Sequence, residues 1–190
     1  MNTRFLGIAF LVGSLIVMLN GFRTIPLGIK PYEDTLAAAS YFLWGIGGVC
    51  GMLGLMRLNV LGSNTIARAA GFLPLLGFAA FVVGEGLRIV GFINTESALY
   101  NTLAGIAWIA VLGGMLVVGI LTIAAKTWRG WQRFVPLMVS VMLPVAIGIG
   151  SAIDNDYIGI LLGWIPWLIL GFLIATAEPE PALQPAGSSD

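Results

Sequence analysis

The sequence contains no histidine and one cysteine, Cys50. Without histidine there is no imidazole to ligate haem iron, to complete most catalytic zinc sites, or to activate a serine or cysteine nucleophile. A single cysteine cannot form an intramolecular disulfide bond. These absences exclude the enzyme classes that depend on histidine, including an intramembrane serine protease with a histidine base.

Charged residues are also scarce, since they make up 9% of the 190 residues, whereas hydrophobic residues make up 58%. A soluble domain carries roughly 25% charged residues. Nine basic and nine acidic side chains are too few to cover the surface of a water-soluble fold of this length. The mean hydropathy of +0.98 indicates the same environment. The surface is therefore expected to face lipid, and a net charge of zero gives nucleic-acid binding no electrostatic basis.

Six apolar stretches each approach or exceed the roughly 20 residues that a transmembrane helix requires. They cover residues 5–22, 35–56, 69–92, 98–125, 134–153 and 157–177. The connections are short, so consecutive helices should be antiparallel neighbours, and the continuous apolar runs do not alternate as barrel strands do. The sequence predicts an all-α fold, a polytopic six-helix transmembrane bundle with short loops, over residues 1–177.

The two ends of the chain carry distinct signals. Arg4 precedes the first apolar stretch, as in a secretory signal, but no small-x-small cleavage motif follows, and we interpret this stretch as an uncleaved first helix. Residues 178–190 are rich in proline, acidic residues and serine, and they lack the apolar area that a packed core requires. We expect them to form a disordered cytoplasmic tail.

Basic residues are distributed unevenly between the two sides of such a bundle. One side holds both termini and carries Arg4, Arg57, Arg68, Lys126, Arg129 and Arg133, and the other side carries Arg23, Lys30 and Arg88. Cytoplasmic loops are enriched in lysine and arginine. The bias predicts that both termini are cytoplasmic, in a plasma membrane of bacterial type.

Glu85 and Arg88 interrupt the third apolar stretch. Ionisable groups inside a span are candidates for function, because their removal from water is costly. They are three residues apart, so they lie on one helix face and can pair. Glu85 follows Arg68 by 17 residues, or about 25 Å of helix, which places it near the far interface. Two interpretations stay open: a self-neutralising structural pair, or a group that handles a proton, an ion or a polar ligand.

Glycine accounts for 26 of the 190 residues, about twice the usual 7%. Gly47 and Gly51, and also Gly159 and Gly163, are four residues apart. In membranes this spacing lets two helix backbones come close together. We expect these four glycines to be helix-packing positions, either within one bundle or against a partner helix or a second copy of the chain.

A short segment after the fourth apolar stretch combines cations with tryptophans: Lys126, Trp128, Arg129, Trp131 and Arg133. Tryptophan is enriched at the membrane–water interface, and cations attract anionic headgroups. We interpret this segment as an interfacial membrane anchor on the cytoplasmic side, and binding to a partner protein is the alternative.

The sixth stretch has two local features. Trp164 and Trp167 lie within it, where they suit either the wall of a hydrophobic ligand pocket or lipid contact and packing. Asp154 and Asp156 precede it, and two carboxylates at this spacing suit a hard cation. Aspartate is also favoured in turns, and we expect a turn in which Asp156 caps the sixth helix.

The sequence contains no phosphate-binding loop, no dinucleotide fingerprint in a strand–helix setting and no Gly-x-Ser-x-Gly elbow. We expect no catalytic residues, no metal and no cofactor. The leading hypothesis is a multi-pass integral membrane protein that is a non-enzymatic helical membrane subunit or interaction protein. Its expected partners are membrane lipid and, in addition, other membrane helices or itself. The alternative is a small permease or ion/proton-coupled transporter that uses Glu85 and Arg88.

Overall fold

A computed structural model of the chain describes residues 2–28, 34–62 and 64–177. It contains six α-helices and one short 3₁₀ helix: α1 (Thr3–Leu27), α2 (Thr35–Arg57), α3 (Thr65–Ile89), α4 (Ala98–Ala125), η1 (Gly130–Phe134), α5 (Val135–Ala152) and α6 (Asp156–Thr176). Six segments are long and apolar enough to cross a membrane, with η1 and α5 forming the fifth. The predicted all-α six-helix bundle is confirmed, and the expected tail at 178–190 lies outside the described residues.

Two helices, α1 and α3, have boundaries that differ from the ends of the apolar runs, and capping residues mark the difference. Asn64 caps α3, because its side-chain oxygen accepts a hydrogen bond from the backbone N–H of Ile66. The helix therefore begins and ends earlier than the predicted range 69–92. Helix α1 extends beyond the predicted range 5–22 and ends at Gly28, whose φ of 61° is readily adopted only by glycine. The remaining four helices agree with the predicted ranges to within one residue at each end.

The turn before α6 differs in detail from the expectation. Asn155 is the cap, because its Oδ1 accepts a hydrogen bond from the backbone N–H of Ile158 at 3.2 Å. The predicted capping role of Asp156 is therefore wrong, and Asp156 is instead the first residue of the helix. A carboxylate in the first turn still interacts favourably with the helix dipole.

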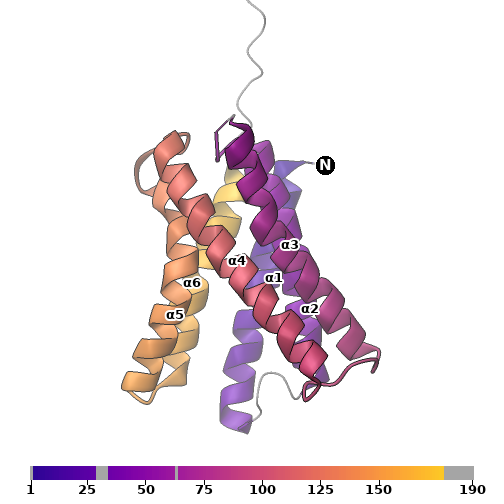
Figure 1. The fold of residues 1–190 in the computed structure, drawn as a ribbon. Helices are drawn as coiled ribbons and strands as arrows, with labels where there is room; N and C mark the ends of the chain where they lie inside the picture. The colour runs from indigo at the N-terminus through magenta and orange to yellow at the C-terminus, as the bar shows by residue number, and fades with distance from the viewer. Residues whose placement is uncertain (1, 29–33, 63, 178–190) are drawn as a thin grey trace, which may run out of the picture.

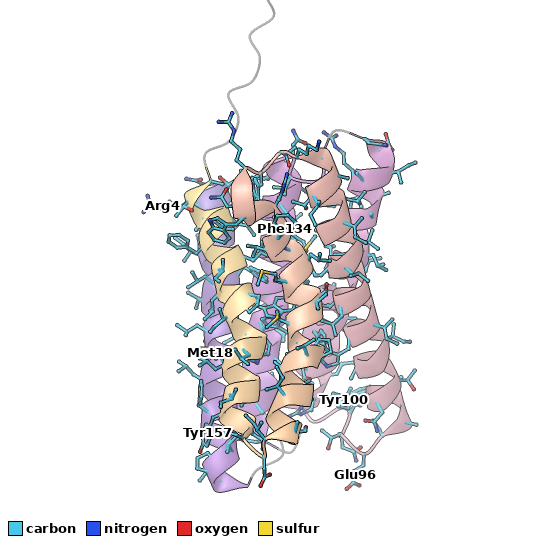
Figure 2. All side chains as sticks on the ribbon, turned by 90° about the vertical axis from the view of Figure 1, so that its left-hand side faces the viewer. Arg4, Met18, Glu96, Tyr100, Phe134 and Tyr157 are labelled. Atoms are coloured by element: carbon cyan, nitrogen blue, oxygen red, sulfur yellow. The ribbon has the colours of Figure 1, made fainter. Side chains whose placement is uncertain are left out.

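The helices form a closed ring in chain order (Figure 1). Each helix packs on the next one in sequence, and α6 returns to pack on α1. Helix α1 begins and α6 ends at one end of the ring, which we call the proximal end, and the α3–α4 and α5–α6 connections lie at the opposite, distal end. Figure 2 shows the proximal end at Arg4 and Phe134, and the distal end at Glu96, Tyr100 and Tyr157.

Trp44 of α2 is the centre of the core. It is fully buried, and its ring centroid lies 5.0–6.3 Å from six other aromatic rings, those of Tyr41, Phe78, Phe81, Trp108, Trp164 and Trp167. Most of these pairs are edge-to-face, an arrangement that contributes about 0.5–1.5 kcal/mol beyond area burial. Within the described part of the chain the indole N–H groups of Trp44 and Trp167 have no hydrogen-bond partner, so packing alone fixes these rings.

Glycine brings helix backbones into direct contact around the ring. A Cβ atom on Gly7 of α1 would lie 2.2 Å from the backbone nitrogen of Ala175 in α6, and one on Gly77 of α3 would lie 2.8 Å from the backbone nitrogen of Val111 in α4. Real Cβ contacts are never this short, so no larger residue fits without moving a helix. These positions therefore set the separation of their helix pairs.

We predict that Gly7→Ala lowers the melting temperature of the protein in detergent or nanodiscs. The added methyl group meets the α6 backbone, and overpacking of this kind costs about 1–3 kcal/mol. The matched control is Gly113→Ala in α4, where nothing lies within 4 Å of the new methyl group. That substitution should leave the melting temperature unchanged or raise it, because alanine favours a helix interior over glycine by about 0.5–1 kcal/mol. Equal melting temperatures for both variants would contradict this account of the packing.

Candidate functional site

Arg88, in the last turn of α3, connects three helices at the distal end. Its Nη1 donates hydrogen bonds to Oε2 of Glu85 at 3.0 Å and to the hydroxyl of Tyr100 at 3.2 Å, and its Nη2 donates to the backbone oxygen of Asp34 at 2.7 Å. The Tyr100 hydroxyl in turn donates to Oε1 of Glu85 at 2.8 Å. The side chains of Glu85 and Arg88 are 4% and 8% exposed. The pair is buried, charge-balanced and hydrogen-bonded on both sides.

This geometry matches the predicted pairing of Glu85 with Arg88, and it adds two partners that the sequence analysis missed. Tyr100 lies in the first turn of α4 and Asp34 caps α2. Both residues belong to helix ends that lie beside the end of α3 in the ring. The short connection between α3 and α4 is the sequence feature that could have indicated that Tyr100 lies near Arg88. Because the two charges pair with each other and with groups of α2 and α4, the arrangement joins the ends of these helices.

Asp34 also connects this cluster to α1. Its carboxylate pairs with Arg23, and Arg23 donates two further hydrogen bonds, at 2.9 and 3.2 Å, to Oδ1 of Asn20. The Arg23 guanidinium and the backbone N–H of Leu36 hold the pKa of Asp34 below its ordinary value of 3.8. Asp34 is therefore ionised near neutral pH. Through its carboxylate and its carbonyl, the distal ends of α1, α2, α3 and α4 form one polar network.

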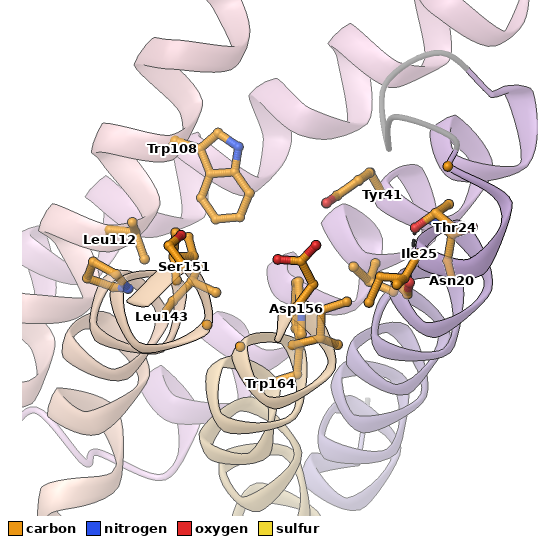
Figure 3. A pocket seen from close by; sticks show the side chains of 18 residues that line it. Asn20, Thr24, Ile25, Tyr41, Trp108, Leu112, Leu143, Ser151, Asp156 and Trp164 are labelled. Atoms are coloured by element: carbon orange, nitrogen blue, oxygen red, sulfur yellow. Dashed lines mark hydrogen bonds between the residues drawn. The ribbon is translucent and has the colours of Figure 1, made fainter. Parts of the chain in front are cut away.

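A cavity of about 700 Å³, the distal cavity, lies beside this network (Figure 3). Its wall is formed by α1, α2, α4, α5 and α6. The apolar and aromatic part of the wall includes Tyr41, Trp108, Leu112, Leu143 and Trp164. The polar part includes Asn20, Thr24, Ser151 and Asp156. Of the two open interpretations of Trp164 and Trp167, the structure puts Trp164 on a cavity wall and Trp167 in the core.

Polarity is graded along the distal cavity. Helix α5 contributes Ser151 at its distal end and Leu143 eight residues away, and α6 contributes Asp156 at its first position and Trp164 eight residues further on. Eight residues correspond to about 12 Å of helix. The cavity thus has a polar mouth at the distal end and an apolar interior that extends toward the middle of the bundle.

The distal cavity exists because α4 and α5 separate toward the distal end (Figure 1). Near the proximal end they touch, since a Cβ on Gly119 of α4 would lie 2.5 Å from Cα of Leu137 in α5. Further along, Gly113 and Gly105 of α4 and Gly148 of α5 have nothing within 4 Å of a Cβ position. The distal part of α4 is instead held to α3 by the hydrogen bonds of Tyr100 with Glu85 and Arg88.

A second cavity of about 440 Å³ adjoins the first and is lined by Glu85, Arg88 and Tyr100, among others. Tyr41 and Trp108 line both cavities, so their rings stand between the two spaces. The hydroxyl of Tyr41 has no hydrogen bond to any residue that the structure describes. It is therefore available to a ligand.

The four candidate packing glycines all lie in contacts within the bundle. Cβ atoms on Gly47 and Gly51 of α2 would lie 2.7 Å from atoms of α1, and those on Gly159 and Gly163 of α6 would lie 3.1 and 2.9 Å from atoms of α5. Of the two expected uses of these glycines, the geometry corresponds to packing within one chain. Gly159 also lines the distal cavity.

The candidate anchor segment lies at the proximal end, between α4 and α5. Trp128 packs against the hydrophobic core, and the guanidinium of Arg133 lies 4.9 Å from the ring centroid of Phe134. The exposed side chains of the segment are those of Lys126, Arg129 and Trp131. Cations and one tryptophan therefore face outward at this end, as an interfacial segment requires.

Comparison with known proteins adds no relative. No protein-family model, curated protein or solved structure matched this chain in these comparisons. Among the described residues, no three histidine, cysteine, aspartate or glutamate side chains are grouped so that they could hold a metal ion. Function must therefore be argued from the distal network and the distal cavity.

We predict that Arg88→Met destabilises the protein by about 3–5 kcal/mol, because it leaves the Glu85 carboxylate buried without a counter-ion. The double variant Glu85→Gln/Arg88→Met removes both charges and should recover part of this loss. Melting temperatures of the two variants in nanodiscs measure the difference. A double variant that is no more stable than Arg88→Met would show that the two charges are not coupled.

Proposed function

We propose that the protein is a non-enzymatic interaction protein of the membrane and that its partner is a lipid, with one hydrocarbon chain held in the distal cavity. The observation that carries the proposal is the grading of this cavity from Asp156 and Ser151 at its mouth to Leu143 and Trp164 in its interior. A lipid has the same division into a polar headgroup and an apolar chain.

The volume of the cavity favours a lipid chain over a partner helix. A helix of about 10–12 Å diameter occupies roughly 420–610 Å³ for each turn of about 5.4 Å. The distal cavity of about 700 Å³ therefore corresponds to between roughly one and two helical turns, whereas a membrane-spanning helix has more than about five. It falls within the roughly 300–1,000 Å³ of ordinary small-ligand pockets. A single flexible chain uses this space, whereas a membrane-spanning helix of another subunit does not.

The transporter alternative is less well supported by the distal network. Glu85 and Arg88 hydrogen-bond to each other and to Tyr100 and Asp34, so a transported ion would have to displace these partners. Between this network and the proximal end the core consists mainly of packed aromatic and aliphatic side chains around Trp44, and its buried polar groups are a few hydroxyls without charge. Transport of a hydrophilic solute requires polar groups along its path.

The composition of the cavity wall supports a non-enzymatic role. Among its described lining residues there is one carboxylate, Asp156, and no lysine, cysteine or second acid. Hydrolysis of a lipid ester needs a nucleophile together with a base positioned to activate it. Ser151 lines the cavity, but the structure records no hydrogen bond between its hydroxyl and a base.

The proposed orientation puts the proximal end in the cytoplasm and the mouth of the cavity at the opposite surface of a plasma membrane of bacterial type. Among the described residues the distal end carries two basic side chains, those of Arg23 and Arg88, and the proximal end carries six, those of Arg4, Arg57, Arg68, Lys126, Arg129 and Arg133. The positive-inside rule counts basic residues and assigns the more basic end to the cytoplasm. The ligand would then come from the outer leaflet.

Cysteine labelling in intact bacterial cells tests this orientation. In a Cys50→Ser background, Glu96→Cys at the distal end should react with a membrane-impermeant maleimide added outside. Arg129→Cys at the proximal end should react only after the cells are permeabilised. The reverse pattern would place the cavity mouth in the cytoplasm and overturn the orientation.

Native mass spectrometry of the full-length protein from mild detergent tests lipid binding. We expect one retained lipid per chain, and we expect Leu112→Trp to lower the retained fraction about tenfold or more. The indole would take space in the cavity, and each buried CH₂ of a chain contributes about 0.8 kcal/mol. The matched control, Ile109→Trp, changes a 75% exposed position on the same helix and should retain lipid normally. If the wild-type protein retains no lipid, or if both variants behave alike, the proposal fails.

A further inference from the structure

The mouth of the distal cavity contains an acid without a partner. At the distal end both described arginines are paired, Arg23 with Asp34 and Arg88 with Glu85. Asp156, in contrast, has no ion pair among the described residues, and it lines the cavity. Figure 3 shows its carboxylate directed into the space that the lining side chains surround.

The other groups at the mouth are neutral. Ser151, Thr24 and the amide of Asn20 line it, and the Oδ1 of Asn20 is already used by Arg23. The Asn20 amide nitrogen and the Tyr41 hydroxyl therefore remain as donors for ester or phosphate oxygens. No lysine or arginine stands among the cavity residues that the structure describes. An anionic headgroup would meet the Asp156 carboxylate and find no cation among the lining residues that the structure describes.

An ammonium group matches this mouth in two respects. It neutralises the unpaired charge of Asp156, and it can donate hydrogen bonds to the carboxylate. The apolar interior beyond the mouth receives the chain that carries the headgroup. The mouth and the interior together therefore fit an amphiphilic ligand whose polar end is positively charged.

We propose that the distal cavity selects a lipid with an ammonium-bearing headgroup and that Asp156 binds the ammonium group. This inference rests on the proposed function, since it assigns the headgroup of the lipid whose chain occupies the cavity. In this proposal Asp156 binds the ligand in addition to its interaction with the dipole of α6. The hydroxyl of Tyr41 donates a hydrogen bond to an oxygen of the ligand.

The test is a competition between two lipids with identical acyl chains. Full-length protein is equilibrated in nanodiscs that contain equal amounts of phosphatidylethanolamine and phosphatidylglycerol, and the lipids that remain bound are counted by native mass spectrometry. We expect a roughly two- to fivefold preference for phosphatidylethanolamine, the size of one partly exposed ion pair. In Asp156→Asn the ratio should fall to about one, while the total of retained lipid stays nearly the same.

Asp154→Asn is the matched control. Asp154 and Asp156 are both exposed, but Asp154 does not line the cavity. The loss of Asp154 therefore changes the surface charge by the same amount and should leave the preference intact. Two results would overturn the inference: retained lipid without a headgroup preference in the wild type, or an equal loss of preference in both variants. Either result leaves the proposed function standing, whereas the absence of any retained lipid would refute the proposed function itself.

Discussion

Direct contact between helix backbones at glycine is the interaction on which the rest of this bundle depends. Between helices in lipid there is no hydrophobic driving force, so close packing and polar contacts must hold them together. Gly7 against Ala175 closes the ring between the first and last helices, and Gly77 against Val111 fixes α3 to α4. The aromatic cluster around Trp44 fills the space that these contacts enclose.

The same contacts determine where the ring opens. Helices α4 and α5 meet at Gly119 and Leu137 near the proximal end, whereas at the distal end the network around Asp34 joins α1 to α4 and includes neither α5 nor α6. The distal part of α4 therefore stays packed on α3 and is separated from α5. The distal cavity is a consequence of this difference, and its polar mouth is formed by distal residues of α1, α5 and α6.

The sequence predicted the features that depend on one helix at a time. Apolar length alone identified all six helices, and the three-residue spacing of Glu85 and Arg88 predicted their pairing. The spacing of Gly47 and Gly51 indicated close helix contact without naming the partner helix. Tyr100 and the carbonyl of Asp34 were missed because they reach Arg88 from other helices. The cavity could not be predicted for the same reason, because the tilt of α4 is set by packing between helices and produces no periodic pattern in the sequence. Among the residues of the cavity wall, only Trp164 was predicted as a possible pocket residue.

A crystal structure of the full-length protein grown from a lipidic mesophase tests the central claim most directly, that glycine contacts and the Asp34 network hold α4 away from α5 around an occupied cavity. The account predicts that the distal parts of α4 and α5 are separated and that elongated non-protein density runs from Asp156 toward Trp164. A structure in which α4 packs along the whole length of α5, with no space between Trp108 and Trp164, would contradict it.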